Sequence, residues 1–127
     1  NMSTANIFEV ATRKKYRYPY KGMITTEDLW DLSLTALDSI YKTLNKQAKQ
    51  SQEESLLNTS ASNETLENQI AIIKYIVATK QQEQVDRLKE KERAEQKQKI
   101  MEILADKQDE TLKGKSVEEL QKMLEEM

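Results

Sequence analysis

Cysteine and histidine are both absent from this 127-residue chain. The lack of cysteine excludes disulfides, thiol nucleophiles and cysteine-ligated metal sites. The lack of histidine removes the commonest general base, the serine triad in its usual form and the Glu-x-x-His ligand pairs of helical di-iron sites. We therefore expect a protein that is not an enzyme, with no catalytic residue, no metal and no cofactor.

Glycine and proline are scarce as well. Gly22 and Gly114 are the two glycines and Pro19 is the single proline, so the 91 residues between the glycines contain no strong helix breaker. Charged residues make up 33% of the chain, whereas an ordinary globular domain has roughly 25%. The sequence thus predicts an all-α, elongated protein with a thin core.

Long apolar runs are missing too. The densest patch, from Ile70 to Ala78, is interrupted by Lys74 and is far shorter than the ~20 residues of a membrane-spanning helix. The N-terminus lacks the charged-then-apolar layout of a secretion signal. We expect a soluble, cytoplasmic protein without a membrane partner.

The first 24 residues differ in composition from the rest of the chain. They carry five cations against the single acid Glu9. Apolar or aromatic residues occupy alternate positions at Phe8, Val10, Tyr16, Tyr18 and Tyr20. Such alternation is typical of a strand, and Pro19 restricts that strand to a sheet edge. Residues 1–24 are therefore interpreted as a basic-aromatic arm that is extended or forms a short β-strand.

This arm is the candidate nucleic-acid site. Cations can neutralise phosphates while tyrosine rings stack on the bases of a single strand. The candidate residues are Arg13, Lys14, Lys15, Tyr16, Arg17, Tyr18, Tyr20 and Lys21. Two alternatives stay open: the tyrosines pack on the following helix while the cations are merely solvated, or the arm docks on an acidic protein surface.

An amphipathic helix is predicted over residues 25–50. Thr25 and Thr26 can cap its first N–H groups, and Glu27 and Asp28 lie at the positive end of its dipole. Apolar residues then recur every three or four positions, which gives one broad apolar face. The residues of this stripe are Trp30, Leu34, Leu37, Tyr41, Leu44 and Ala48.

A long helix is predicted over residues 64–112, after a linker at residues 51–63 that is rich in serine and asparagine. Leu56 and Leu57 are expected to anchor the linker. At 1.5 Å per residue the helix would span roughly 70 Å and resemble one strand of a coiled coil. Its middle, residues 89–99, is charged or polar apart from Ala94. The apolar positions of the helix are Leu66, Ile70, Ile73, Val77, Ile100, Ile103 and Leu104.

Gly114 is expected to end the long helix, because glycine readily adopts the left-handed conformation of a C-terminal cap. Ser116 and Glu119 form a capping-box pattern that begins a short helix over residues 116–126. The short helix needs a partner for its apolar face, either in the same chain as a helical hairpin or in a neighbouring copy. That face comprises Val117, Leu120, Met123, Leu124 and Met127.

Three acidic residues recur at helical spacing in the last part of the long helix. Glu102, Asp106 and Asp109 share a helix face and can hold a divalent cation weakly, but a metal site needs more convergent ligands than one helix provides. We interpret them as a solvated acidic face.

Four further segments of the sequence are informative: residues 7–13 (Ile-Phe-Glu-Val-Ala-Thr-Arg), 26–32 (Thr-Glu-Asp-Leu-Trp-Asp-Leu), 103–109 (Ile-Leu-Ala-Asp-Lys-Gln-Asp) and 116–120 (Ser-Val-Glu-Glu-Leu). They resemble a family of small, functionally uncharacterised proteins of tailed bacteriophages. The resemblance covers most of the chain and implies only a phage context. It suggests a particle accessory protein, a DNA-associated factor, or an inhibitor of a host defence or host enzyme.

The leading hypothesis is a non-enzymatic assembly or adaptor protein that acts through helix–helix contacts. A homo-oligomer is expected because three apolar stripes are too far apart in sequence to share one core, and a phage or host protein is a further candidate partner. The candidate protein interface comprises Trp30, Leu34, Leu37, Tyr41, Leu44, Leu66, Ile70, Ile73, Val77, Ile100, Ile103, Leu104, Leu120, Met123 and Leu124.

Overall fold

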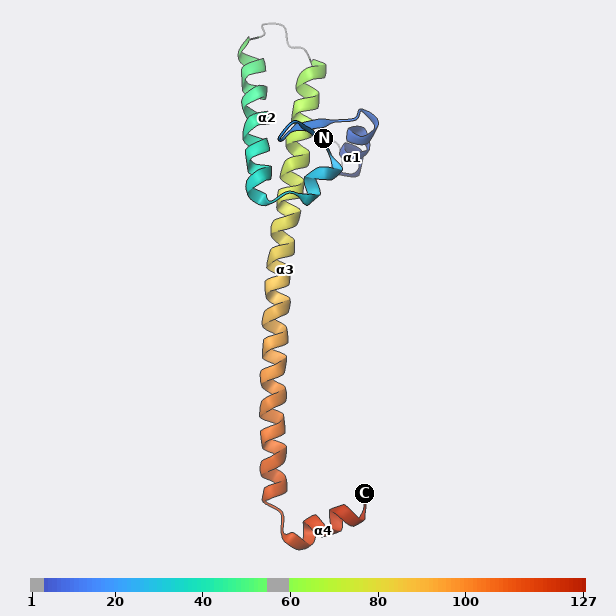
Figure 1. The fold of residues 1–127 in the computed structure, drawn as a ribbon, viewed down its shortest axis with the longest axis vertical. Coiled ribbons are helices and arrows are strands. Elements are labelled where there is room, and N and C mark those ends of the chain that lie inside the picture. Colours follow the sequence, from blue (N-terminus) through green and yellow to red (C-terminus); the bar gives the residue numbers. More distant parts are fainter. Residues whose placement is uncertain (1–3, 55–59) are drawn as a thin grey trace. The chain divides into compact units, whose positions relative to one another are not determined.

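A computed structural model describes residues 4–54 and 60–127 (Figure 1). It confirms the all-α prediction, with one long helix and only a small two-stranded sheet near the N-terminus. The elements are α1 Thr4–Arg13, β1 Arg17–Pro19, β2 Met23–Thr25, the 3-10 helix η1 Glu27–Asp31, α2 Leu34–Glu54, α3 Ser60–Lys113 and α4 Val117–Glu125. The chain divides into two compact units, one ending at Glu83 and one beginning at Gln84.

The extended arm predicted over residues 1–24 is wrong for its first half, because residues 4–13 form helix α1. Ile7, Phe8, Val10 and Ala11 recur with helical spacing as well as with the alternation that suggested a strand. All four contribute to the core, with Ala11 only 1% exposed. Burial on one helical face therefore decides between the two periodicities.

A β-hairpin follows α1, which confirms the β-stranded alternative for the second half of the arm. Strands β1 and β2 pair antiparallel, and Tyr18 lies opposite Ile24. Lys21 and Gly22 in the connecting loop have φ angles of 50° and 106°. Glycine adopts such angles at little cost, whereas lysine does not.

The predicted helix at 25–50 begins later than expected. Thr25 and Asp28 do form a reciprocal cap, since the Thr25 N–H donates to Asp28 Oδ2 (3.0 Å) and the Asp28 N–H donates to Thr25 Oγ1 (3.3 Å). These bonds hold the pKa of the Asp28 carboxyl below its usual value. The cap serves only the short helix η1, and α2 starts at Leu34.

The predicted linker at 51–63 is shorter in the structure. Residues 51–54 continue α2 and residues 60–63 already belong to α3. Ser51 Oγ donates a hydrogen bond to Asn63 Oδ1 across the two helices (3.0 Å). Packing between helices overrides the weak helix propensity of serine and asparagine. Leu56 and Leu57 lie outside the described residues.

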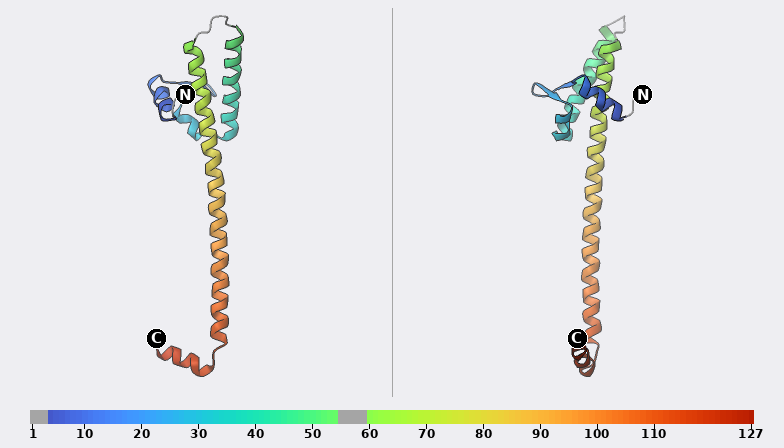
Figure 2. Two further views of the ribbon diagram at one scale, coloured as in Figure 1. Left: turned by 180° about the vertical axis from the view of Figure 1, so that it is seen from behind. Right: turned by 90° about the vertical axis from the view of Figure 1, so that its right-hand side faces the viewer.

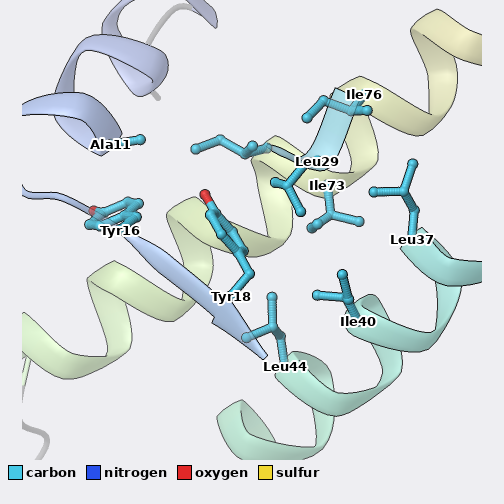
Figure 3. Close-up of a cluster of buried hydrophobic side chains, with 10 residues drawn as sticks. Ala11, Tyr16, Tyr18, Leu29, Leu37, Ile40, Leu44, Ile73 and Ile76 are labelled. Carbon is cyan, nitrogen blue, oxygen red and sulfur yellow. The ribbon is translucent and has the colours of Figure 1, made fainter. Parts of the chain in front are cut away.

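The core forms where α2 runs alongside the first part of α3 (Figures 1 and 2). Both helices and the hairpin contribute to it, and Figure 3 shows how their side chains converge. The buried residues are Ala11, Tyr16, Tyr18, Leu29, Leu37, Ile40, Leu44, Ile72, Ile73 and Ile76. The stripes of residues 30–48 and 66–77 thus share one core, so the expectation that they are too far apart in sequence to do so is wrong.

Helix α3 also anchors the N-terminal elements through hydrogen bonds. Gln69, which is 5% exposed, donates from Nε2 to the Arg17 carbonyl (2.7 Å). Asn68 Nδ2 donates to the Tyr16 hydroxyl (3.1 Å). Lys80 Nζ donates to the Leu32 carbonyl just before α2 (2.7 Å). Polar groups from α3 therefore fix both the hairpin and the entry to α2.

The C-terminal boundary lies where the sequence predicts it, but the left-handed conformation predicted for Gly114 is wrong, because Gly114 does not have a positive φ angle. The Gly114 N–H donates to the Glu110 carbonyl (3.0 Å) where α3 ends. The capping box is confirmed, because Ser116 Oγ accepts from the Glu119 N–H and Glu119 Oε1 accepts from the Ser116 N–H, both at 3.1 Å. This pairing holds the pKa of the Glu119 carboxyl below its usual value.

Candidate interaction surfaces

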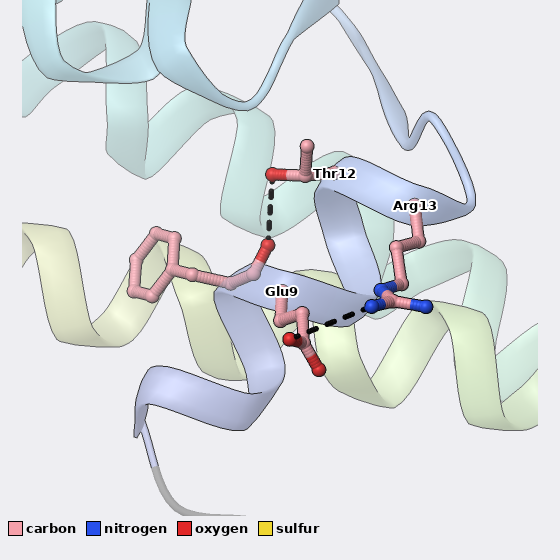
Figure 4. Close-up of polar contacts among 4 residues, drawn as sticks. Glu9, Thr12 and Arg13 are labelled. Atoms are coloured by element: carbon pink, nitrogen blue, oxygen red, sulfur yellow. Dashed lines mark hydrogen bonds and ion pairs between the residues drawn. The ribbon is translucent and has the colours of Figure 1, made fainter.

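Five cations lie around the end of α1 and the hairpin, and all are exposed. We call Arg13, Lys14, Lys15, Arg17 and Lys21 the basic surface. Arg13 Nη2 lies 3.9 Å from Glu9 Oε1, next to the hydrogen bond from Thr12 Oγ1 to the Phe8 carbonyl (Figure 4). Arg17 Nη1 donates to the Tyr16 carbonyl (2.8 Å), and Lys21 Nζ lies 5.5 Å from the centre of the Tyr20 ring.

Two of the three tyrosines of the candidate nucleic-acid site are buried. Tyr16 is 5% exposed and Tyr18 is fully buried, while Tyr20 is half-buried. Burial raises the pKa of Tyr18 to about 12, although the hydrogen bond from Thr26 to its hydroxyl (3.1 Å) acts in the opposite direction. The assignment of Tyr16 and Tyr18 to base stacking is therefore wrong, because their rings pack in the core.

Lys15 occupies a strained position in the basic surface. The Tyr16 N–H donates to the Ala11 carbonyl (3.0 Å) and the Lys15 N–H donates to the Thr12 carbonyl (3.3 Å). This is the Schellman pattern, which places the residue after the helix in the left-handed conformation usually taken by glycine. Lys15 has a φ angle of 54° there, so the helix end carries a backbone strain that a glycine would relieve.

Several residues of the candidate protein interface belong to the chain's own core. Leu37, Leu44 and Ile73 are at most 2% exposed. Their assignment to an interface with another molecule is wrong, because α2, α3 and the hairpin bury them. Partly buried neighbours that pack against this core are Tyr41, Leu66, Ile70 and Val77. Leu34 is partly buried as well.

An aromatic trio lies at the edge of this core. Phe8 from α1, Trp30 from η1 and Tyr75 from α3 have ring centroids 5.7 to 6.4 Å apart. Trp30 is 37% exposed and Tyr75 is 43% exposed. The trio joins three elements of the fold, and sequence spacing within one helix could not reveal it.

A hollow of about 490 Å³ lies between α2 and α3, lined by Leu34, Tyr41, Val77 and their neighbours. Lys74 Nζ lies 5.8 Å from the centre of the Tyr41 ring at this hollow. Among the described residues no cluster of three or more acidic side chains is placed to hold a metal ion. Glu102, Asp106 and Asp109 are exposed on α3.

The second unit presents a different surface. Every residue from Gln81 to Gly114 is exposed, including Ile100, Ile103 and Leu104 at 51–54%. The α4 residues Val117 and Leu124 are both 70% exposed. We define the C-terminal apolar surface as Ile100, Met101, Ile103, Leu104, Leu112, Val117, Met123, Leu124 and Met127, all at least 39% exposed.

Helix α4 covers little of this surface. Met123 from α4 and Leu104 and Leu112 from α3 line a hollow of about 590 Å³. Leu120 is half-buried, whereas Val117 and Leu124 face solvent. A short amphipathic helix needs contacts to stay folded. Because Val117 and Leu124 are largely exposed, the apolar face of α4 is available to a partner.

Comparison with protein-family models, with curated proteins and with solved structures found no match. In the part of the chain that is described, no helix combines the length and apolar character needed to cross a bilayer. Function is therefore inferred from the exposed residues of the two units.

Proposed function

We propose that the protein is a non-enzymatic assembly or adaptor protein that self-associates through the C-terminal apolar surface. The observation that carries this proposal is the exposure of Ile100, Ile103, Leu104, Val117 and Leu124 at more than half of their surface. Contiguous exposed apolar side chains are typical of protein–protein contact sites. The nine residues of α4 also need a tertiary or quaternary contact to remain helical.

Charge reversal on the apolar face tests the proposal. The double variant I100E/L104E places two carboxylates in the centre of the C-terminal apolar surface. The matched control Q98E/A105E adds the same two charges on the outward side of α3. All four positions are exposed in the structure, so the fold should be retained in both proteins.

Sedimentation equilibrium of the full chain and of both variants measures the outcome. We expect the unmodified chain and Q98E/A105E to self-associate, and I100E/L104E to sediment as a monomer. If the unmodified chain is a monomer at high micromolar concentration, the proposal of self-association is contradicted. An oligomer that persists in I100E/L104E would place the contact elsewhere.

A second candidate function is electrostatic binding of nucleic acid by the basic surface. Five exposed cations within one hairpin and helix end favour it, but only Tyr20 among the three tyrosines is partly exposed, which weakens any stacking contribution. Binding to a single-stranded oligonucleotide should then be salt-sensitive and should disappear when Arg13, Lys14 and Arg17 are changed to glutamate. Binding that persists in this variant, or that ignores salt, would contradict the hypothesis.

A further inference from the structure

We propose that the partner of the C-terminal apolar surface is a second copy of this chain lying antiparallel to the first. The proposal rests on the self-association proposed above and adds its orientation. The two copies would be related by a two-fold axis that passes near residue 102, so that Ile100 of each copy faces Leu104 of the other. Such a contact is self-complementary and closed.

The residues that precede and follow Ile100 and Leu104 on the same face of α3 favour the antiparallel pair. The alternating spacing of four and three that defines a coiled-coil seam continues through Arg93, Lys97 and Lys107. In a parallel pair each of these cations would face its own copy across the seam. An antiparallel pair instead places Arg93 opposite Thr111, and cations meet only between Lys97 and Lys107.

Met101 and Ile103 flank the seam and are 54% and 51% exposed. In an antiparallel pair, residues at equivalent flanking positions meet their own copies near the two-fold axis. Met101 would then contact Met101 and Ile103 would contact Ile103. In a parallel pair Met101 would lie beside Gln96 and Ile103 beside Gln108. The antiparallel arrangement therefore joins all four apolar residues of this segment in one patch.

The charge of the two flanks agrees with this orientation. Residues 91–99 of α3 carry four cations and two acids, a net charge of +2. Residues 105–113, which would lie opposite them, carry two cations and three acids, a net charge of −1. An antiparallel pair places flanks of opposite sign side by side, whereas a parallel pair places like charges together. Complementary charge fixes orientation more than it adds affinity.

Distances between spin labels on the full chain test the orientation directly. Because the chain has no cysteine, Lys91→Cys, Glu102→Cys and Lys113→Cys each provide a single labelling site. These positions are eleven residues apart, about three helical turns, so all three lie on the side of α3 that faces away from Leu104. Labels there leave the apolar patch unchanged.

The antiparallel pair predicts the shortest label-to-label distance at position 102. Labels at 91 and at 113 should be separated by about 33 Å along the axis, because each residue away from the two-fold axis adds about 3 Å. Equal short distances at all three positions would mean a parallel pair and would overturn the orientation while leaving self-association intact. A monomeric mass with no label-to-label distance would overturn both proposals.

A charge change at Lys107 gives an independent test. In the antiparallel pair, Lys107→Glu replaces two contacts between Lys97 and Lys107 by two opposite-charge contacts. Dimerisation should become about fivefold tighter, the effect of two exposed ion pairs. In a parallel pair the two introduced carboxylates would face each other, so an unchanged or weaker dimer would contradict the proposal. Lys91→Glu on the outward side is the matched control and should leave the affinity unchanged.

Discussion

The two units of this chain differ in the burial of similar apolar stripes. Between Leu66 and Val77, α3 packs against α2 and the hairpin, and Ile72, Ile73 and Ile76 are buried. Between Ile100 and Leu112 the same helix keeps its apolar residues exposed. Spacing predicts which residues share a helix face. Whether that face is a core or an interaction surface depends on which elements reach it.

Alanine substitution at one isoleucine of each unit should give the largest difference in stability between the two units. Ile76→Ala removes a fully buried side chain and should lower the free energy of unfolding by about 2–5 kcal/mol. Ile100→Ala truncates a side chain that is 54% exposed and should cost less than about 1 kcal/mol in dilute solution. Urea unfolding followed by circular dichroism measures both. Equal losses would show that Ile100 is also buried within one chain.

Alkaline pH should act on the first unit through Tyr18. The pKa of Tyr18 is raised in the folded state from 10.0 to about 12, so the unfolded chain loses this proton first. The contribution of neutral Tyr18 to the free energy of unfolding is fully present below pH 10. It should decline by about 2 kcal/mol as the pH rises to about 12. Urea unfolding across this range should show a smaller decline in Tyr18→Phe. If Tyr20→Phe reduces the decline equally, Tyr18 is not its source.

Loss of the Gln69 amide should loosen the hairpin of the first unit. Gln69→Ala removes the donor to the Arg17 carbonyl at a buried position, and we expect a loss of about 1–2 kcal/mol in the free energy of unfolding. Gln98→Ala, on the exposed part of α3, is the matched control and should change stability by less than about 0.5 kcal/mol. Thermal unfolding measures the stability of both variants. Similar midpoint temperatures would contradict the loss expected for Gln69→Ala.

Relief of strain at Lys15 should produce the smallest effect and the opposite sign. Lys15→Gly should stabilise the first unit by about 1 kcal/mol, because glycine adopts the left-handed conformation without the steric cost of a Cβ atom. Lys15→Ala removes the same charge but keeps the Cβ atom, so it should leave stability nearly unchanged. Chemical denaturation of both variants separates backbone strain from charge, and equal gains would point to charge instead.

Local signals in the sequence predicted local structure well. The glycine stop and the box of Ser116 and Glu119 indicated the correct start of α4, because both act between residues close in sequence. The predicted cap by Thr25 was also present, paired with Asp28, but it served η1 rather than a long helix. The predicted cap by Thr26 was wrong, because the Thr26 hydroxyl donates to the Tyr18 hydroxyl instead. A cap specifies where a helix begins and not how far it continues.

The errors came from features that depend on distant parts of the chain. Phe8 and Val10 fit a strand as well as a helix until the burial of Ala11 and Phe8 selects the helix. The donor to the hairpin, Gln69, lies 52 residues after Arg17, and no sequence pattern links the two. The candidate interface contained both buried and exposed stripes, because a stripe carries no information on what covers it.

Amide hydrogen exchange of the full chain at low and high protein concentration tests the central contrast most directly. We predict that protection at residues 66–80 is the same at both concentrations, because the chain's own core supplies it. Protection at residues 100–113 and in α4 should increase with concentration, because a second copy covers them. Protection that is independent of concentration in both segments would contradict the claim that the second unit is an interaction surface.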